Sequence, residues 1–403
     1  MSLIATFKLL LKNRDTTSIE SRFFWLHLVL IASFSLATET SAFATTTRGF
    51  RPQNDAEVIE LFAPKTKAQP TTEADAIAQA RIAIQSSREL QDPRYLGRAR
   101  ALLKPWWGKE NASNEVLTLQ ATIEQSLHLF SDARKTLAGL TTRDTQNLQA
   151  WLTLASLDRL AGNYGAALTA CERASRSTSS NVAKIYGDLC SADIQCHLKN
   201  DAIPFRSLLM SFVRLRLNPD LLSWGFSLLA ECEERTGDTV KSLDAYRSSI
   251  SLAPDNYTAI SYSDALLRNK QPEKAMQVLA TLPKSDSVLL RLAHSLRLKE
   301  FGQWKMIHSD LMQRFDESIA RGDDPKLHAR ERAYAALWLS DDAAQAVAQS
   351  KLNIESQKEV IDWLLLFESL EKANDKVSLK RYAAIVQSTG LRDHRLRAWA
   401  VTK

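Results

Sequence analysis

Apolar residues recur through most of the chain at the three- and four-residue spacing of amphipathic helices. The pattern is clearest over residues 147–174, where two such runs flank a turn at Gly162-Asn163. Large apolar side chains in this stretch would fill the space around a helix crossing: Trp151, Leu154, Leu160 and Tyr164. Small side chains stand where two closely crossing helices leave no room: Ala155, Ala167 and Ala174. The stretch predicts two short helices joined by a tight turn.

The same pattern returns along the chain, and it resembles the tetratricopeptide repeat (TPR). Ala121 precedes Ala155 by the 34 residues of that family's period, and His128 falls near the turn position of Gly162. A clear copy spans residues 226–254, and a copy at 257–283 is shorter, so one of its helices should be short. The resemblance implies an all-α fold, a right-handed α-solenoid of TPR-like helix pairs with capping helices at both ends.

The predicted mature chain has three segments. Residues 45–72 read as an extended linker, because proline- and threonine-rich stretches flank one short apolar patch. Residues 73–325 carry the TPR-like solenoid. Residues 326–403 carry the C-terminal helical repeats and cap, and end in a polar tail. Trp106 and Trp107 end the first helical pair, where they would cover the open end of the solenoid or, alternatively, offer a ligand platform.

The N-terminus has the pattern of an export signal. Basic residues within 1–22 precede an apolar run over residues 23–37, and Ala42-Phe43-Ala44 follows with small residues at the positions that signal peptidase reads. We therefore expect residues 1–44 to be a signal peptide cleaved near Ala44 and the protein to be periplasmic or secreted. The alternative is an uncleaved anchor, although the run is shorter than the roughly 20 residues of a membrane span.

Composition narrows the function. A formal charge of +6 on 403 residues forms no dense basic block, which argues against nucleic-acid binding. The chain contains no metalloprotease, phosphate-loop or nucleophile-elbow motif. The histidines are scattered, and the adjacent Cys196 and His197 would point about 100° apart on a helix. We therefore predict no enzymatic activity, no cofactor and no metal.

Four cysteines, Cys171, Cys190, Cys196 and Cys232, would allow two disulfides in an oxidising compartment, with three possible connectivities. Cys171 lies on a second helix and Cys190 on the first helix of the following pair, and such helices are packed neighbours in a solenoid. We hypothesise a Cys171–Cys190 disulfide. Cys196 and Cys232 are expected to be buried thiols that behave as small apolar residues.

A second resemblance concerns the compartment. Several segments resemble a proteobacterial group of exported TPR proteins of unassigned activity. These segments are Asp92 to Gly97, Pro105-Trp106-Trp107, Gln125 to Phe130 and His328 to Glu331, together with Asn353, Gln357 and Asp362. The TPR resemblance implies that the first helix of each pair lines a concave groove. Candidate ligand-binding residues in that groove are Gln125, Arg159, Trp224, Glu231, Glu234 and Arg268.

Polar groups spaced along a groove suit an extended or helical peptide. The expected function is a non-catalytic, exported scaffold that binds a peptide or protein partner. The alternative is an accessory or assembly factor of an envelope polysaccharide or enzyme complex.

Overall fold

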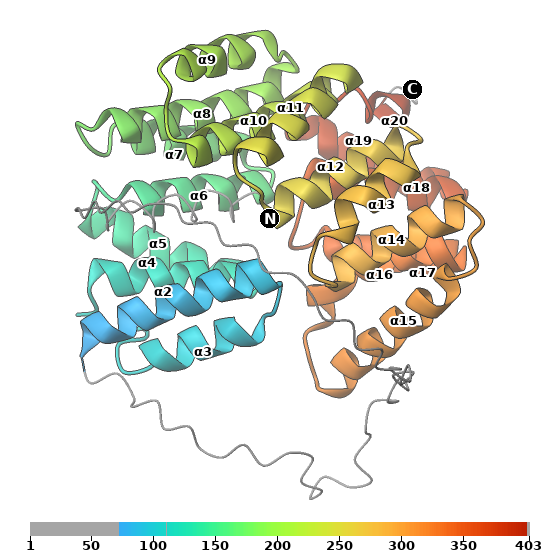
Figure 1. The fold of residues 1–403 in the computed structure, drawn as a ribbon, viewed down its shortest axis with the longest axis horizontal. Coiled ribbons are helices and arrows are strands. Elements are labelled where there is room, and N and C mark those ends of the chain that lie inside the picture. The colour runs from blue at the N-terminus through green and yellow to red at the C-terminus, as the bar shows by residue number, and fades with distance from the viewer. Residues whose placement is uncertain (1–71, 110, 401–403) are drawn as a thin grey trace, which may run out of the picture.

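The computed structural model describes residues 72–109 and 111–400, and this part of the chain is helical without strands. The predicted signal peptide and most of the predicted linker, residues 1–71, lie outside the described residues. Eighteen of the nineteen α-helices in this part of the chain pack in nine consecutive pairs, and α20 follows the last pair. The helices are α2 (Glu73–Leu90), α3 (Arg94–Leu103), α4 (Asn114–Ser126), α5 (Phe130–Arg143), α6 (Leu148–Leu160), α7 (Tyr164–Ser175), α8 (Asn181–Lys199), α9 (Ile203–Arg214), α10 (Pro219–Thr236), α11 (Thr239–Leu252), α12 (Asn256–Arg268), α13 (Pro272–Ala280), α14 (Asp286–Leu298), α15 (Trp304–Ala320), α16 (Ala329–Ala335), α17 (Ala343–Asn353), α18 (Val360–Lys372), α19 (Lys376–Ser388) and α20 (Arg397–Ala400). The fold is thus an α-solenoid of TPR-like helix pairs (Figure 1).

Local sequence signals explain where these helices begin. The side chains of Ser113, Asn147, Asp255 and Asp342 each accept a hydrogen bond from a backbone N–H in the first turn of the helix that follows. Pro219 and Pro272 stand at the start of α10 and α13, where proline's missing N–H costs nothing. The short helix expected within residues 257–283 is α13, with nine residues.

Each of the nine turns within a helix pair contains one residue in the left-handed backbone conformation. These residues are Gln91, His128, Gly162, Asn200, Gly237, Lys270, Glu300, Asp341 and Asn374. The conformation favours glycine, but only two of the nine are glycine, so most repeats lack the glycine that marks the turn in the sequence. The turn geometry therefore persists through repeats whose sequences have diverged.

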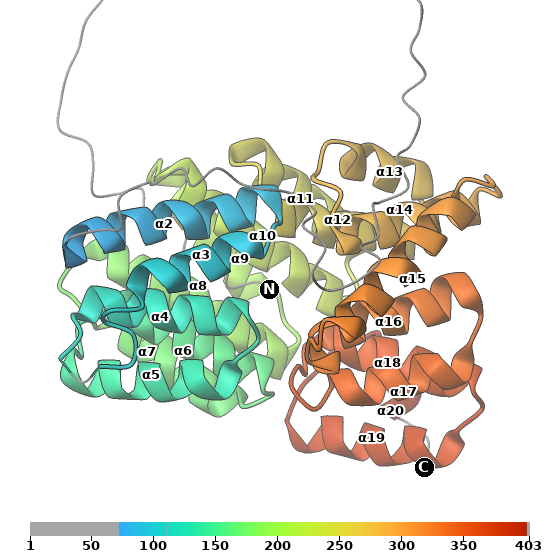
Figure 2. The same ribbon diagram turned by 90° about the horizontal axis from the view of Figure 1, so that it is seen from below.

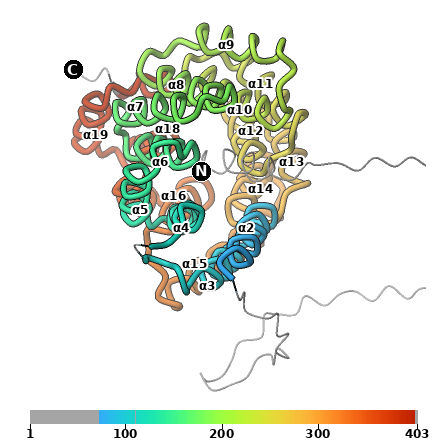
Figure 3. The backbone as a smooth tube through the Cα atoms, turned by 90° about the vertical axis from the view of Figure 1, so that its left-hand side faces the viewer, coloured from blue at the N-terminus to red at the C-terminus, as the bar shows by residue number. Residues whose placement is uncertain are grey.

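The pairs wind around a central axis, with the first helices α4, α6, α12 and α14 inside and second helices such as α5, α9 and α13 outside (Figure 3). The C-terminal pairs stack beside the N-terminal ones (Figure 2). One core cluster joins α6 and α7 to α18 and α19, and contains Ala155, Tyr164, Trp363, Phe367 and Val386. On the other side, the Asn256 amide donates to the last carbonyls of α2, Arg88 and Glu89, at 3.0 and 3.2 Å. The solenoid closes into a ring.

The C-terminal end differs from the polar tail that was expected. Leu391 and Leu396 are buried in the cluster of α6, α7, α18 and α19, and α20 follows them. Trp106 and Trp107 pack against the core of the first helical pair, as covers for an open end would. None of the helices between residues 72 and 400 combines the length and the apolar content that crossing a bilayer requires.

Candidate functional site: the inner face of the ring

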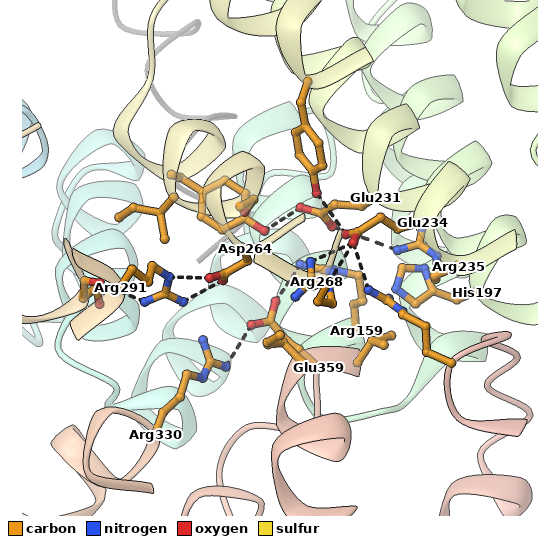
Figure 4. A pocket seen from close by; sticks show the side chains of 18 of the residues that line it. Arg159, His197, Glu231, Glu234, Arg235, Asp264, Arg268, Arg291, Arg330 and Glu359 are labelled. Carbon is orange, nitrogen blue, oxygen red and sulfur yellow. Dashed lines mark hydrogen bonds and ion pairs between the residues drawn. The ribbon is translucent and has the colours of Figure 1, made fainter. Parts of the chain in front are cut away.

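The last turns of the first helices line the inner face of the ring with charged side chains. Arg159 comes from α6, Glu234 from α10 and Arg268 from α12 (Figure 4). Asp193 comes from α8 and lies further from the end of its helix. Gln125, Arg159 and Asp193 are each 34 residues apart, and so are Glu234 and Arg268. One TPR period therefore places these side chains side by side on neighbouring helices.

Opposite charges meet across these neighbouring helices. The guanidinium of Arg268 donates two hydrogen bonds, of 2.7 and 3.0 Å, to one oxygen of Glu234, and Arg159 lies 3.9 Å from Asp193. Arg291 of α14 contacts both oxygens of Asp264 on α12, at 2.6 and 2.7 Å. These ion pairs follow one another around the ring. We call this series of paired charges on the inner face the charge ladder.

The C-terminal half of the chain adds a second set of charges to this ladder. Arg159 donates to Glu359 at 3.0 Å, and Glu359 also accepts a 3.0 Å bond from Arg330. Arg330 contacts both oxygens of Asp362, at 2.7 and 2.8 Å. Arg395 lies 3.3 Å from Glu234. The inner face is therefore partly occupied by the chain's own C-terminal residues.

Backbone hydrogen bonds join the C-terminal half of the chain to three successive first helices. Carbonyls in the last turns of α6, α8 and α10 have no partner within their helices, and each accepts an N–H from the C-terminal half. The three bonds are all 2.8 Å: Lys358 to Leu160, Arg392 to His197, and His394 to Arg235. A side chain at Gly237 would approach the His394 ring to 3.0 Å, so glycine permits this docking.

Burial and neighbouring charges shift the pKa values of these groups. Burial would raise the pKa of Glu359, but surrounding positive charge, to which the guanidinium groups of Arg159 and Arg330 contribute, holds that pKa below the usual range. Burial raises the pKa of Glu231, which accepts a 2.6 Å hydrogen bond from the Tyr257 hydroxyl. Burial also lowers the pKa of His197 to about 3, so its imidazole is neutral near pH 7.

Two cavities remain on the inner face, one on each side of the Lys358–Leu160 contact. The first, of about 100 Å³, is lined by Glu231, Glu234, Arg268 and most other members of the charge ladder. The second, of about 190 Å³, lies between the turns of the first three pairs and is lined by Gln125, His128, Leu160 and Gln357. Burial lowers the pKa of His128 to about 4, so this lining histidine is also neutral.

The structure separates the predicted groove residues into three groups. Glu231, Glu234, Arg268 and Arg159 line the first cavity, but Arg159 is only 6% exposed and is held by Glu359. Gln125 lines the second cavity. Trp224 lies in the core between α8, α9 and α11, 5.5 Å from the Tyr186 ring, so it is not an exposed anchor in the groove.

Several members of the ladder were not predicted as groove residues, although Arg330 and Asp362 belong to the positions that carry the second resemblance. They are Asp193, Asp264, Arg291, Arg330, Glu359, Asp362 and Arg395. The sequence did contain one signal for these ion pairs: opposite charges spaced one repeat period apart, as Arg159 and Asp193 are. No sequence signal marks Glu359 or Arg395, because their partners lie 200 and 161 residues earlier in the chain.

Disulfides join three consecutive pairs near this face. Cys171 of α7 is bonded to Cys190 of α8, the pairing hypothesised from the sequence. The expectation that Cys196 and Cys232 are thiols is wrong, because they form a second disulfide between α8 and α10. Their separation of 36 residues is close to one period, which places the two cysteines on adjacent first helices. In the described residues no cluster of histidine, cysteine or acidic side chains could hold a metal ion.

No protein-family model matches the chain, and no curated protein matches its sequence. Among solved structures, the crystal structure of the P58(IPK) TPR domain aligns over 75% of this chain and 99% of that one, at 12% identity and a TM-score of 0.25. The crystal structure of yeast Tom70 aligns over 78% of this chain and 85% of that one, at 11% identity and a TM-score of 0.27. Neither similarity is high enough to assign a function.

Proposed function

We propose that the protein is an exported, non-catalytic scaffold that holds a peptide or protein partner against the inner face of its ring. One observation carries the proposal. The last turns of α6, α8 and α10 already bind non-helical polypeptide through their end carbonyls, supplied by the chain's own Lys358, Arg392 and His394. The inner face is therefore built to hold polypeptide backbone at a regular spacing.

The corresponding position on α4 is free for a partner. Gln125 and Ser126 precede Arg159 and Leu160 by one period, and both line the 190 Å³ cavity. The Gln125 side-chain amide forms no hydrogen bond with any described residue. A cavity of this size admits a side chain, since about 150 Å³ is enough for benzene. A partner segment would extend the series of contacts at α6, α8 and α10 to α4 by placing one side chain beside Gln125.

Two further observations support the exported and non-catalytic parts of the proposal. The charged groups of the ladder are engaged with one another, as structural ion pairs are, so a catalytic role would require breaking them. The two disulfides favour an oxidising compartment, in agreement with the signal-like pattern of residues 1–44. The resemblance to exported proteobacterial TPR proteins points to the same compartment.

Filling the second cavity tests the proposal. Partners would be captured from the native envelope with the wild-type protein, with Gln125→Trp, and with Val240→Trp as a control on the outer surface, where Val240 is 70% exposed. We expect a protein that is recovered with the wild type and the control to be lost with Gln125→Trp. Equal recovery with all three proteins would contradict a partner site at this cavity, and recovery of a glycan alone would contradict a protein partner.

A further inference from the structure

The outward face of α3 carries a concentration of positive charge that the inner-face proposal does not use. Between Asp92 and Glu110 the chain has no acidic residue and five basic ones, Arg94, Arg98, Arg100, Lys104 and Lys109, all exposed. The buried face of α3 consists of Leu96, Ala99 and Leu103. Helical spacing therefore turns the basic residues of α3 away from the core, together with the small residues Gly97 and Ala101.

Little in the described residues neutralises this basic face of α3. Arg94 pairs with Asp92 at 2.6 Å, but Arg98, Lys104 and Lys109 form no ion pair with any described residue. Arg100 lies over the Trp107 ring, 5.3 Å from its centroid, an arrangement that orders the cation and keeps its charge. Four cations thus lack an ion-pair partner among the described residues: Arg98 and Arg100 on α3, Lys104 at its C-terminal end, and Lys109 in the segment that follows.

The shape of the basic face of α3 and the tryptophans at its edge indicate which kind of partner it could bind. A side chain at Gly97 would have nothing within 4 Å, so the face is open at its centre. Trp106 and Trp107 are half-buried at its end, and their indole N–H groups donate no hydrogen bond to a described residue. Basic side chains beside interfacial tryptophans are what a charged lipid surface selects.

We propose that the basic face of α3 binds the anionic surface of a lipid bilayer. Electrostatic attraction supplies the affinity, and Gly97 and Ala101 let the helix lie close to the headgroups. The contact is peripheral, because no described helix is suited to crossing a membrane. It would hold the outer side of the first helical pair against the bilayer and leave the inner face of the ring accessible to a partner.

Vesicle binding by the purified full chain tests this proposal independently of any protein partner. The protein is sedimented with vesicles of phosphatidylcholine alone and with vesicles that also contain phosphatidylglycerol. The apolar run at residues 23–37 would contribute in both cases, so the ratio of the two affinities isolates the charge effect. The comparison variants are Arg98→Glu with Lys104→Glu, and Lys376→Glu with Lys380→Glu, an equal charge change at exposed positions of α19.

We expect the wild-type protein to prefer anionic vesicles and to lose that preference as salt is added. The α3 variant should bind anionic vesicles roughly thirtyfold more weakly, given the usual contribution of each cation near such a surface. The α19 variant should bind as the wild type does. Equal binding of the wild type to both vesicle types, or equal losses in the two variants, would overturn the proposal, as would retention by soluble polyglutamate but not by vesicles.

Discussion

Arg159 donates a 3.0 Å hydrogen bond to Glu359, a residue 200 positions later, and both side chains are less than a tenth exposed. This pair connects the third helical pair of the solenoid to the last one. Arg159 was expected to be free in an open groove, but it holds the chain's own C-terminal half. The inner face therefore holds the two halves of the chain together and is also a candidate partner site.

Removing the cation of the Arg159–Glu359 pair should strongly destabilise the fold. Arg159→Met leaves Glu359 buried with Arg330 as its remaining cation, and we expect the free energy of unfolding to fall by about 3–5 kcal/mol. Urea denaturation followed by circular dichroism measures the loss. Lys326→Met is the control, since it breaks an exposed 2.8 Å pair with Glu355 and should cost less than about 1 kcal/mol. Equal effects of the two substitutions would contradict a stabilising role for the buried pair.

The two disulfides should stabilise the ring. Replacing either cysteine pair by alanine should lower the free energy of unfolding by about 2–4 kcal/mol, chiefly because the unfolded chain loses a constraint. Peptide mapping without reductant should recover Cys171 linked to Cys190 and Cys196 linked to Cys232. Recovery of free thiols at these positions in the exported protein would refute the pairing.

Acid should destabilise the protein through His197. Burial lowers the pKa of His197 to about 3, whereas an unfolded histidine has a pKa near 6.5, so the unfolded state binds the additional proton between these values. The resulting stability is present above about pH 6.5 and is lost as the pH falls towards 3. Asp193, whose pKa is lowered by His197, Arg235 and Arg159 against the effect of burial, contributes in the same direction at lower pH.

Denaturation between pH 7 and pH 4 measures this dependence. His197→Asn keeps a neutral polar group at the same place, and its stability should vary less with pH in this range than that of the wild type. A variant that retains the full wild-type slope would assign the acid sensitivity to other groups. The comparison concerns slopes, so a constant loss of stability in the variant does not affect it.

Gly187 should tolerate no side chain. A Cβ there would lie 2.4 Å from the backbone of Ser175, where α7 and α8 approach most closely beside the Cys171–Cys190 disulfide. Gly187→Ala should therefore cost about 3 kcal/mol, because neither helix can move away freely. Gly139→Ala in α5 is the matched control, with nothing within 4 Å, and should stabilise the protein by about 0.5–1 kcal/mol. Thermal unfolding of the two variants should shift in opposite directions.

The helices were predictable because their signals are local. The apolar spacing of residues 147–174 and the prolines at the start of α10 and α13 act within one or two turns of chain. The closure of the ring was not predictable, since Lys358 and Leu160 carry no pattern that pairs them across 198 residues. Tertiary packing of α18 and α19 on α6 and α7 decides that contact.

The candidate site was predicted in part for the same reason. Four predicted residues line the inner cavities because the repeat period assigns them to the C-terminal halves of first helices: Gln125, Glu231, Glu234 and Arg268. Trp224 lies ten residues before Glu234 on α10, in the half of the helix that α8 and α9 cover. Membership of a first helix is therefore insufficient, and the turn of the helix on which a residue lies decides its exposure.

The bond from Lys358 to Leu160 also bears on how the protein could have changed over time. An open solenoid can gain or lose a repeat, because each unit contacts only its neighbours. Here an additional helix pair inserted between α6 and α18 would move Lys358 away from Leu160 and so break this bond. The same insertion would separate Arg159 from Glu359 and would have to be accommodated around the disulfide-linked helices. The number of repeats is thereby fixed by geometry, so variation in this protein should be confined to substitutions and to the lengths of its outer loops.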